Sequence, residues 1–474
     1  MKRAAALLLA GVLGACTPPT THQRVRPASA LALGLTGVPA PAIDAAWWRG
    51  FGDPQLDRVV ADALAGSPTL DQALARLAQA DAQLSARRAD EAPQASLDAQ
   101  LQAARLSGRY TIPPPYRGTV RTVGTAGINL GYNLDLFGRQ RAVVEGARAT
   151  ALAAGLDAAA ARLAIAGSVT QAYLELARAE AQATIARETI ATRQGSLRLV
   201  RIQIRNQLAS HVQEQAALAL LDQARGALTR AQGSRALAAD ALAALAGRGP
   251  DYAAQLGPTA LRIDAALPVP AALPADLLAR RADVAASLAR IDAAEAARQV
   301  ARRAFYPNVN LGGLIGLQAI GLGNLLSLDA AQLGAGPAIH LPLFDGGRLR
   351  ADLTGAAAGV DLTTAQYNAA VIGAVREAAD ALALSGNLQQ QRADAAAVAH
   401  DLAETDRLNG VRVRAGLDSK LGLVDTDVRL LDARLALANL AIDAARSRVQ
   451  LLLALGGGWD GDPIAAGPKQ DIRP

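Results

Sequence analysis

The sequence has 474 residues and a formal net charge of +6; 51% of its residues are hydrophobic, but only 3% are aromatic. Its apolar content is therefore mainly alanine and leucine, which suits closely packed helices better than the thick core of a large globular enzyme. Acidic and basic residues alternate along the predicted helices, and no basic block stands beside aromatic residues. This pattern argues against nucleic-acid binding.

The N-terminus has the pattern of a secretory signal: a charged start, a short apolar run over residues 4–12 and a small-residue end. The apolar run is too short to span a bilayer as a helix. The segment LGAC (13–16) looks like a bacterial lipobox, in which cleavage before the cysteine accompanies its acylation. Cys16 is the sole cysteine and cannot form an internal disulfide. We expect a signal peptide over 1–15 and lipidation of Cys16; an ordinary signal cut nearby is the alternative.

The chain contains an internal duplication. The stretch YNLDLFGRQR (132–141) is echoed by IHLPLFDGGRLR (339–350), again between an alternating segment and a long helical one. A 24-residue segment from Leu74 also aligns without gaps with the segment from Leu288. Each half is therefore predicted to run helix, strand, loop, strand, long helix, tight turn, helix.

Four segments alternate between apolar and polar residues, as strands with one wet face do. They lie at about 94–104, 124–136, 308–318 and 332–343. Their length suits the wall of a transmembrane β-barrel with a polar interior. A soluble sandwich would alternate equally well, but the lipoprotein signal and the aromatic residues at the strand ends favour a membrane. Four strands cannot close a water-filled barrel, so other copies of the chain must supply the rest.

The long helical segments, 139–205 and 347–413, carry heptad seams. At 1.5 Å per residue, each is on the order of 100 Å long, several times the thickness of a bilayer core. We expect them to continue from the strands as the wall of a tunnel. The Pro/Gly-rich interval 247–274 and both chain ends are expected to form a belt that holds Trp47, Trp48 and Trp459.

Several longer motifs resemble the TolC-like outer-membrane efflux proteins, in particular the NodT-like lipoprotein branch associated with RND pumps. These motifs are WWRGFGDPQLDRVV near the start, LLARRADVAASLARIDAAEAARQVARRAFYPNVNL, LPLFDGGR, and VRAGLDSKLGLVDTDVRLLDARLALANLAIDA in the last hairpin. The resemblance covers nearly the whole mature chain. It implies a membrane protein of mixed α and β structure, mainly α, with two structural repeats. It also implies a homotrimer, in which a 12-stranded outer-membrane β-barrel continues into a 12-helix periplasmic α-barrel.

The expected organisation follows from this resemblance together with the repeat. It comprises the signal peptide (1–15), an N-terminal equatorial segment (16–66), a first repeat (67–246, with its tip at 206–211), an equatorial linker (247–274), a second repeat (275–455, with its tip at 414–420) and a C-terminal equatorial tail (456–474).

The resemblance implies the outer-membrane exit duct of a tripartite efflux system, anchored by lipid and extending into the periplasm of a Gram-negative bacterium. Its partners would be a periplasmic adaptor and an inner-membrane RND transporter, and its cargo drugs or other small molecules. The exit duct of a type I protein-secretion system is one alternative, and a non-channel periplasmic coiled-coil lipoprotein is another. The four scattered histidines and the absence of nucleotide or metal motifs give no basis for an enzyme, a cofactor or a metal site.

Candidate functional residues lie where the long helices end. The turns resemble the Gly-Leu-x-Ser/Thr adaptor-docking motif of the family, here Leu208, Ser210, Gly416, Leu417 and Ser419. The first turn has Gln207 where the second has glycine, which leaves its geometry open. Family members often narrow the tip with aspartate rings six and nine residues beyond the glycine. The first of these positions is Gly422 here; the second is Asp425, and Asp418 is a second candidate for the gate.

Overall fold

The structure is a computed structural model that describes residues 24–29, 33–35, 43–109, 112, 114–264 and 276–464. The chain divides into two compact units. The first contains Leu77–Ala154 and Ser287–Tyr367, and the second contains Ala28–Arg76, Gly155–Ala286 and the chain from Asn368 onward. Each unit therefore takes part of both sequence repeats, so the repeats are not themselves the compact units of the fold.

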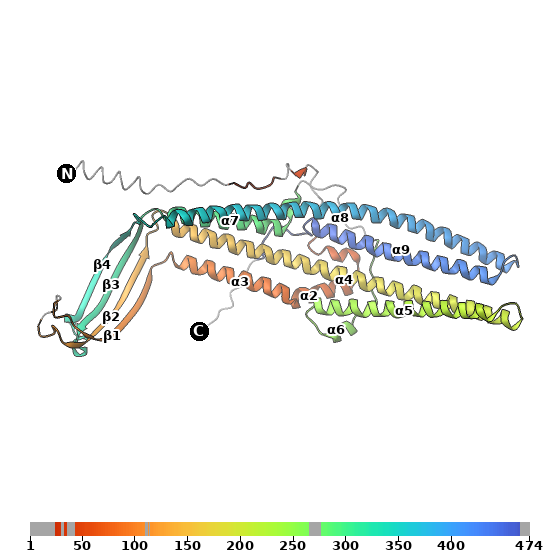
Figure 1. Ribbon diagram of the computed structural model, residues 1–474, viewed down its shortest axis with the longest axis horizontal. Helices are drawn as coiled ribbons and strands as arrows, with labels where there is room; N and C mark the ends of the chain where they lie inside the picture. Colours follow the sequence, from red (N-terminus) through yellow and green to blue (C-terminus); the bar gives the residue numbers. More distant parts are fainter. Residues whose placement is uncertain are drawn as a thin grey trace. The chain divides into compact units, whose positions relative to one another are not determined.

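The elements follow the chain as labelled in Figure 1. In order they are η2 (Trp47–Phe51), α2 (Pro54–Gly66), α3 (Pro68–Ala89), β1 (Gln94–Arg105), β2 (Val120–Asn133), α4 (Arg139–Arg205), α5 (His211–Leu245), α6 (Pro250–Ala254), η3 (Leu277–Arg280), α7 (Ala282–Arg303), β3 (Asn308–Ile320), η4 (Leu322–Asn324), η5 (Leu328–Ala330), β4 (Ala331–His340), α8 (Arg348–Arg414) and α9 (Lys420–Ala454).

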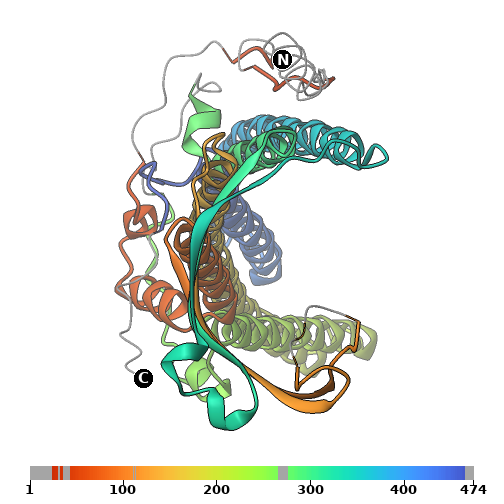
Figure 2. The same ribbon diagram turned by 90° about the vertical axis from the view of Figure 1, so that its left-hand side faces the viewer.

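The first unit contains one antiparallel sheet in the order β1-β2-β3-β4, so β1 and β4 are its edges (Figure 1). Figure 2 turns these strands towards the viewer. The register aligns one apolar row across all four strands: Leu97, Ile128, Ile315 and Leu333. A polar row on the opposite face holds Gln100, Thr125 and Gln318. The apolar row is open to the surroundings in the single chain, with Leu97 75% and Leu333 81% exposed. The sheet thus has an apolar face that the chain itself does not bury.

Three strands differ in extent from their sequence alternation by two residues or more. β3 continues to Ile320 rather than ending at 318. β2 begins at Val120 rather than 124, because its first residues pair with the end of β1 through Val120 and Arg105. It ends at Asn133 rather than 136, just before Asp135 takes a positive φ of 41°. β4 ends at His340 rather than 343. Pro342 follows two residues later and lacks the N–H that a ladder needs.

An aspartate shortly before each long helix accepts hydrogen bonds from backbone N–H groups at the start of that helix. The Asp135 carboxylate accepts from the N–H groups of Gln140 (2.9 Å) and Arg141 (3.0 Å). Asp345 accepts from Leu349 (2.8 Å) and Gly347 (2.9 Å) in the same way. These bonds, that from Leu349 first, hold the pKa of Asp345 below its ordinary value. An N-terminal carboxylate satisfies backbone donors that would otherwise lack a partner and fixes where the strand gives way to the helix.

The main hydrophobic core lies in the second unit, where η2 and α2 pack against α4, α5 and α9. Its fully buried side chains include Phe51, Leu56, Tyr173, Leu174, Leu242 and Leu452, and Trp47 is 3% exposed. One 18-residue window of α4 is apolar enough for a membrane span, and 44% of it is buried. Helices at the core of a water-exposed bundle have the same composition.

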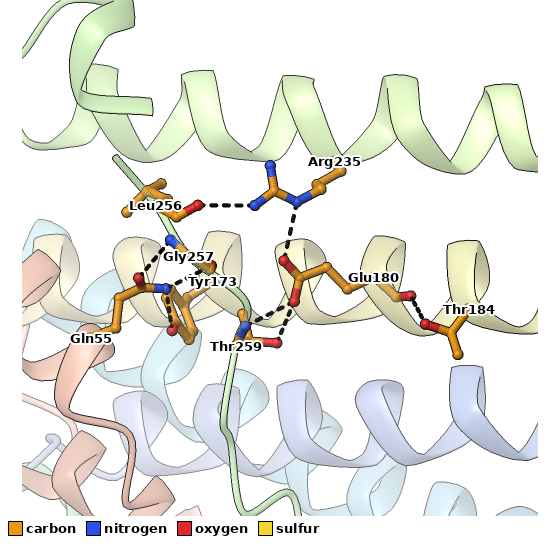
Figure 3. Close-up of polar contacts among 8 residues, drawn as sticks. All are labelled: Gln55, Tyr173, Glu180, Thr184, Arg235, Leu256, Gly257 and Thr259. Atoms are coloured by element: carbon orange, nitrogen blue, oxygen red, sulfur yellow. Dashed lines mark hydrogen bonds and ion pairs between the residues drawn. The ribbon is translucent and has the colours of Figure 1, made fainter. Parts of the chain in front are cut away.

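A polar network beside this core ties the linker after α6 to α2, α4 and α5 (Figure 3). The Gln55 amide donates to the Tyr173 hydroxyl (2.9 Å) and accepts from the Gly257 N–H (2.9 Å). Glu180 of α4 accepts from Arg235 of α5 (3.1 Å) and from both the N–H and the hydroxyl of Thr259 (2.9 and 2.8 Å). Burial, with the hydrogen bond to Asp53, raises the pKa of the Tyr173 hydroxyl. The network thus fixes the axial position of α4 relative to α5.

Polar pairs also set the register between the helices of the second unit. From α4 to α9, Glu175 pairs with Arg446, Arg178 with Asp443, and Gln182 with Asn439. Glu188 and Arg434 continue this series at 3.9 Å. Between α4 and α5, Glu180 pairs with Arg235 and Arg201 with Glu214. Both members of each α4–α5 pair lie equally far from the turn at Gln207–Leu208, as expected for a regular antiparallel hairpin.

Candidate functional site

The two interhelical turns carry most of the candidate functional residues. We call residues 206–210, between α4 and α5, the first tip, and residues 415–419, between α8 and α9, the second tip. In the second tip the Leu417 N–H donates to the Arg412 carbonyl (2.9 Å) and the Gly416 N–H to the Val413 carbonyl (3.1 Å). Gly416 has a φ of 74°. This is the Schellman arrangement, which caps a helix with a left-handed residue.

The first tip has the same geometry although it lacks glycine. The Leu208 N–H donates to the Gln203 carbonyl (2.8 Å) and the Gln207 N–H to the Ile204 carbonyl (2.9 Å). Gln207 takes a φ of 58°, a left-handed conformation that is unfavourable for a residue with a Cβ. The question that the sequence left open at Gln207 is thereby answered: the turn is kept, and Gln207 bears the strain.

Serine and leucine have different roles in the two tips. Ser210 forms a capping box with Gln213, and the Ser419 hydroxyl accepts from the Gly422 N–H at 3.2 Å. Both serines therefore begin the next helix, which gives them a structural role in any case. The leucines pack little within the chain: Leu208 is 76% exposed and Leu417 72%. A Schellman turn usually buries this residue against its own helix, so the leucines remain available to a partner.

The helices beneath the tips pack into one small core. Leu197 and Val200 of α4 and Leu221 of α5 are buried together, and Leu421 of α9 packs against them. The first turn of α9 therefore lies against the α4–α5 hairpin, which places the tips side by side. Arg201 holds Glu214 at 2.8 Å across that hairpin. This hydrogen bond, with a second from His211, keeps the pKa of Glu214 below its ordinary value.

The predicted gate aspartates both lie near the tip of the second hairpin, Asp418 in the turn itself and Asp425 near the start of α9. Asp418 accepts from the Ser419 N–H at 2.7 Å and lies 3.6 Å from Arg412. Asp425 pairs with Arg429 at 3.0 Å, and its side chain is 66% exposed. Neither carboxylate is buried within one chain. Any narrowing of a passage by these groups depends on neighbouring copies.

Sequence reasoning missed a second acidic pair in the same hairpin. Asp406 of α8 and Asp427 of α9 are half-buried, and their carboxyl groups lie close enough to share a hydrogen bond when Asp427 is protonated. One turn away, the Asn409 amide donates to the Thr426 hydroxyl at 2.9 Å. The two aspartates lie equally far from the turn at Gly416–Leu417, so reflection of the sequence about that turn would have found them.

Two further predicted features concern lipid and metal. Cys16, the predicted lipidation site, lies outside the described residues. Over the part of the chain that the structure describes, no group of three or more His, Cys, Asp or Glu residues is arranged to hold a metal ion. The groups that the described tips offer to a partner are exposed leucines and carboxyl groups.

A family model and the similar proteins agree on one family. The family model described as "Outer membrane efflux protein" matches residues 59–248 and 273–457. The outer membrane protein OprJ of Pseudomonas aeruginosa is 32% identical over 467 residues, which cover 96% of this chain and 95% of OprJ. The multidrug resistance outer membrane protein MdtP of Escherichia coli is 28% identical, with coverage of 97% and 98%.

Solved structures agree in fold. The outer membrane protein VceC of Vibrio cholerae superposes with a TM-score of 0.79 at 32% identity, over 88% of this chain and 99% of VceC. The outer-membrane channel OprN gives a TM-score of 0.78 at 26% identity, over 94% and 99%. These similarities extend over the strands, the long helices and the tips, because they cover almost the whole described chain.

We predict that Gly416→Ala destabilises the second tip by about 1–2 kcal/mol, the cost of a Cβ in the left-handed conformation. Nothing lies within 4 Å of such a Cβ, so the cost is conformational and not a clash. Gln207→Ala is the matched control, because that position already carries a Cβ at positive φ. Hydrogen exchange of the tip amides should quicken in Gly416→Ala and stay unchanged in Gln207→Ala. Equal effects in both variants would contradict the assignment.

Proposed function

The chain belongs to the outer membrane efflux protein family, and on this premise we propose that it is the exit duct of a tripartite efflux system. The resemblance drawn from its motifs is confirmed. It is an outer-membrane protein, and its relatives are efflux channels of multidrug systems, not enzymes.

Three copies are proposed to pool their strands into one 12-stranded barrel. The observation that carries this proposal is the sheet, with two unpaired edges and an exposed apolar face. In hydrocarbon, every unpaired backbone group costs several kcal/mol, so only a closed sheet is stable. Joining β1 of one copy to β4 of the next satisfies both edges. It also turns the apolar face towards lipid and the polar face inward.

The helices of the second unit would assemble in the same manner into a 12-helix tunnel. The contacts within one chain link α5 to α4, α4 to α9, and α9 to α8. This order leaves α5 and α8 as the two outer helices. Both carry large exposed apolar side chains in this unit: Leu237 on α5, and Ile372 and Val398 on α8. A neighbouring copy would bury them.

The proposed lipid anchor at Cys16 fits the course of the chain that follows it. The N–H groups of Arg24 and Val25 donate to Asp361 of α8 at 2.9 and 3.1 Å. Asp361 lies 13 residues after the first residue of α8, or roughly 20 Å along the helix. Cys16 precedes Arg24 by eight residues, which span at most about 28 Å when extended. An acylated Cys16 could therefore reach the start of α8, next to β4.

The proposed partners are a periplasmic adaptor, docked on the tips, and an inner-membrane RND transporter. The exposed leucines of the two tips support docking, and the relatives' names support a role in drug efflux. In a duct of this kind the pump selects the cargo, so we assign drugs or other small molecules as a class. The tip serines and Gly416 would shape the docking surface, and Leu208 and Leu417 would contact the adaptor.

The proposed assembly predicts opposite effects for arginine on the two faces of β1. Leu97→Arg places a charge on the proposed lipid face, at a cost of about 2–4 kcal/mol per chain near the bilayer midplane. Gln100→Arg places the same charge on the polar face and should be tolerated. We expect heat-sensitive trimers and ion channels in planar bilayers from the wild type and Gln100→Arg, and far fewer from Leu97→Arg. A wild-type protein that remains monomeric and conducts no ions would refute the proposal.

Adaptor docking is tested by shortening the tip leucines. Each buried leucine contributes about 1.5–3 kcal/mol, so Leu208→Ala with Leu417→Ala should weaken adaptor binding at least tenfold. Binding of the adaptor from the same bacterium to the detergent-solubilised protein gives the readout. Leu326→Ala is the control, because Leu326 is 90% exposed in the β3–β4 loop. Wild-type affinity in the double variant would exclude the leucines as docking residues.

We propose Asp425, and secondarily Asp418, as the periplasmic gate. Three copies of a carboxylate around one axis repel one another and attract cations. Asp425→Ala should therefore raise single-channel conductance or antibiotic leakage and weaken block by cations, and Asp418→Ala should do so less. Asp222→Ala is a matched control, because Asp222 is also exposed and lies 3.0 Å from an arginine on its own helix. Unchanged conductance and unchanged cation block in Asp425→Ala would exclude this gate.

A further inference from the structure

The Asp406–Asp427 pair is a contact between two acids on facing helices. The Oδ1 atom of Asp406 is inaccessible to solvent and has no hydrogen-bond donor among the described residues apart from the neighbouring carboxyl group. A carboxylate buried without a donor is costly. A proton on Asp427 removes this cost, because the Asp427 O–H then donates to Asp406.

Without that proton, a nearby cation would have to neutralise the two carboxylates, and the surrounding cations are engaged elsewhere. On α9, Arg434 is the cation that acts on Asp427, but it also lies 3.9 Å from Glu188 of α4. On α8, the neighbouring Arg407 is held by Glu404 at 2.8 Å. The register from α4 to α9, continued from Gln182–Asn439, places the uncharged Gln194 opposite Asp427. Within the described chain, no cation is placed to bridge the two carboxylates.

Burial and the contact with Asp406 raise the pKa of Asp427 from 3.8 to about 6. A raised pKa means that the folded hairpin binds the proton more tightly than separated helices do. The contact is therefore most favourable in acid and weakens as the pH rises from about 4 to about 6. Above that range both groups are charged and repel each other across the α8–α9 interface.

We propose that Asp406 and Asp427 form a proton-operated joint of the second tip. One shared proton holds α8 and α9 together in acid, and its release to water near neutral pH loosens the hairpin and favours an open duct. The Asn409–Thr426 hydrogen bond joins the same two helices beside the pair, on its tip side. The effect on conductance rests on the channel function proposed above.

The size of the response follows from linkage. If the carboxyl group of Asp427 regains its ordinary pKa of 3.8 when the helices separate, the opening equilibrium of each hairpin rises on the order of tenfold between pH 5 and pH 7.5. Asp427→Asn supplies a permanent amide donor to Asp406. It should keep the joint closed and remove this response.

The test compares single-channel open probability at pH 5 and pH 7.5 in planar bilayers. The wild type should open on the order of tenfold more at pH 7.5, and Asp427→Asn should show no pH response. Asp401→Asn is the matched control, because Asp401 is an exposed aspartate on α8 and should respond like the wild type. The same comparison in an Asp425→Asn background separates this joint from the proposed gate.

A second measurement follows the helices directly. Spin labels at the exposed positions Leu408 and Arg429 report the α8–α9 distance in the full chain. The distance distribution should broaden above pH 6 in the wild type and stay narrow in Asp427→Asn. Channels whose pH response survives Asp427→Asn, or distances that do not change with pH, would overturn the joint. A complete lack of channels would count against the proposed duct instead.

Discussion

The backbone groups along the free edges of β1 and β4 impose the constraint on which the rest of this protein depends. A 12-residue edge and a 10-residue edge face no partner strand among the described residues. Water can satisfy such groups, but lipid cannot. The apolar rows on the same sheet require lipid or protein contact. In the proposed assembly, neighbouring copies close the sheet and satisfy both features. The duplicated sequence gives each copy two similar pairs of strands for that closure.

The two hairpins of the second unit are alike in geometry but differ in chemistry. Both tips use the same Schellman turn and the same serine-capped restart of the helix. Across the first hairpin, Arg201 and Glu214 form an ion pair, and Glu180 and Arg235 form another near the polar network. Across the second, two acids meet. The duplication therefore preserved the turn, while the residues that join the paired helices diverged.

Much of this fold could be predicted from the sequence, because its elements are long and strictly periodic. Alternation identified the strands and assigned each residue to a face. Strand ends were less predictable, since they depend on the partner strand and on local features such as Asp135 and Pro342. In the second turn, the glycine at 416 predicted the left-handed position. In the first turn, no local signal predicted that Gln207 takes a positive φ, because the rest of the turn imposes this conformation. Predicting the Asp406–Asp427 contact requires knowing which residues of α8 and α9 lie opposite each other. That register follows only when residues equally far from the Gly416–Leu417 turn are paired.

The difference between the hairpins gives the tips unequal responses to acid. The hydrogen bond from Arg201 keeps the pKa of Glu214 below its ordinary value, so that ion pair persists at neutral pH and is lost only as the pH falls through the lowered pKa. The acid pair of the second hairpin has the opposite sign, because its contact is strongest in acid and weakest at neutral pH. Leu421 of that hairpin packs against the α4–α5 core. The first hairpin can thus serve as a fixed wall against which the second moves.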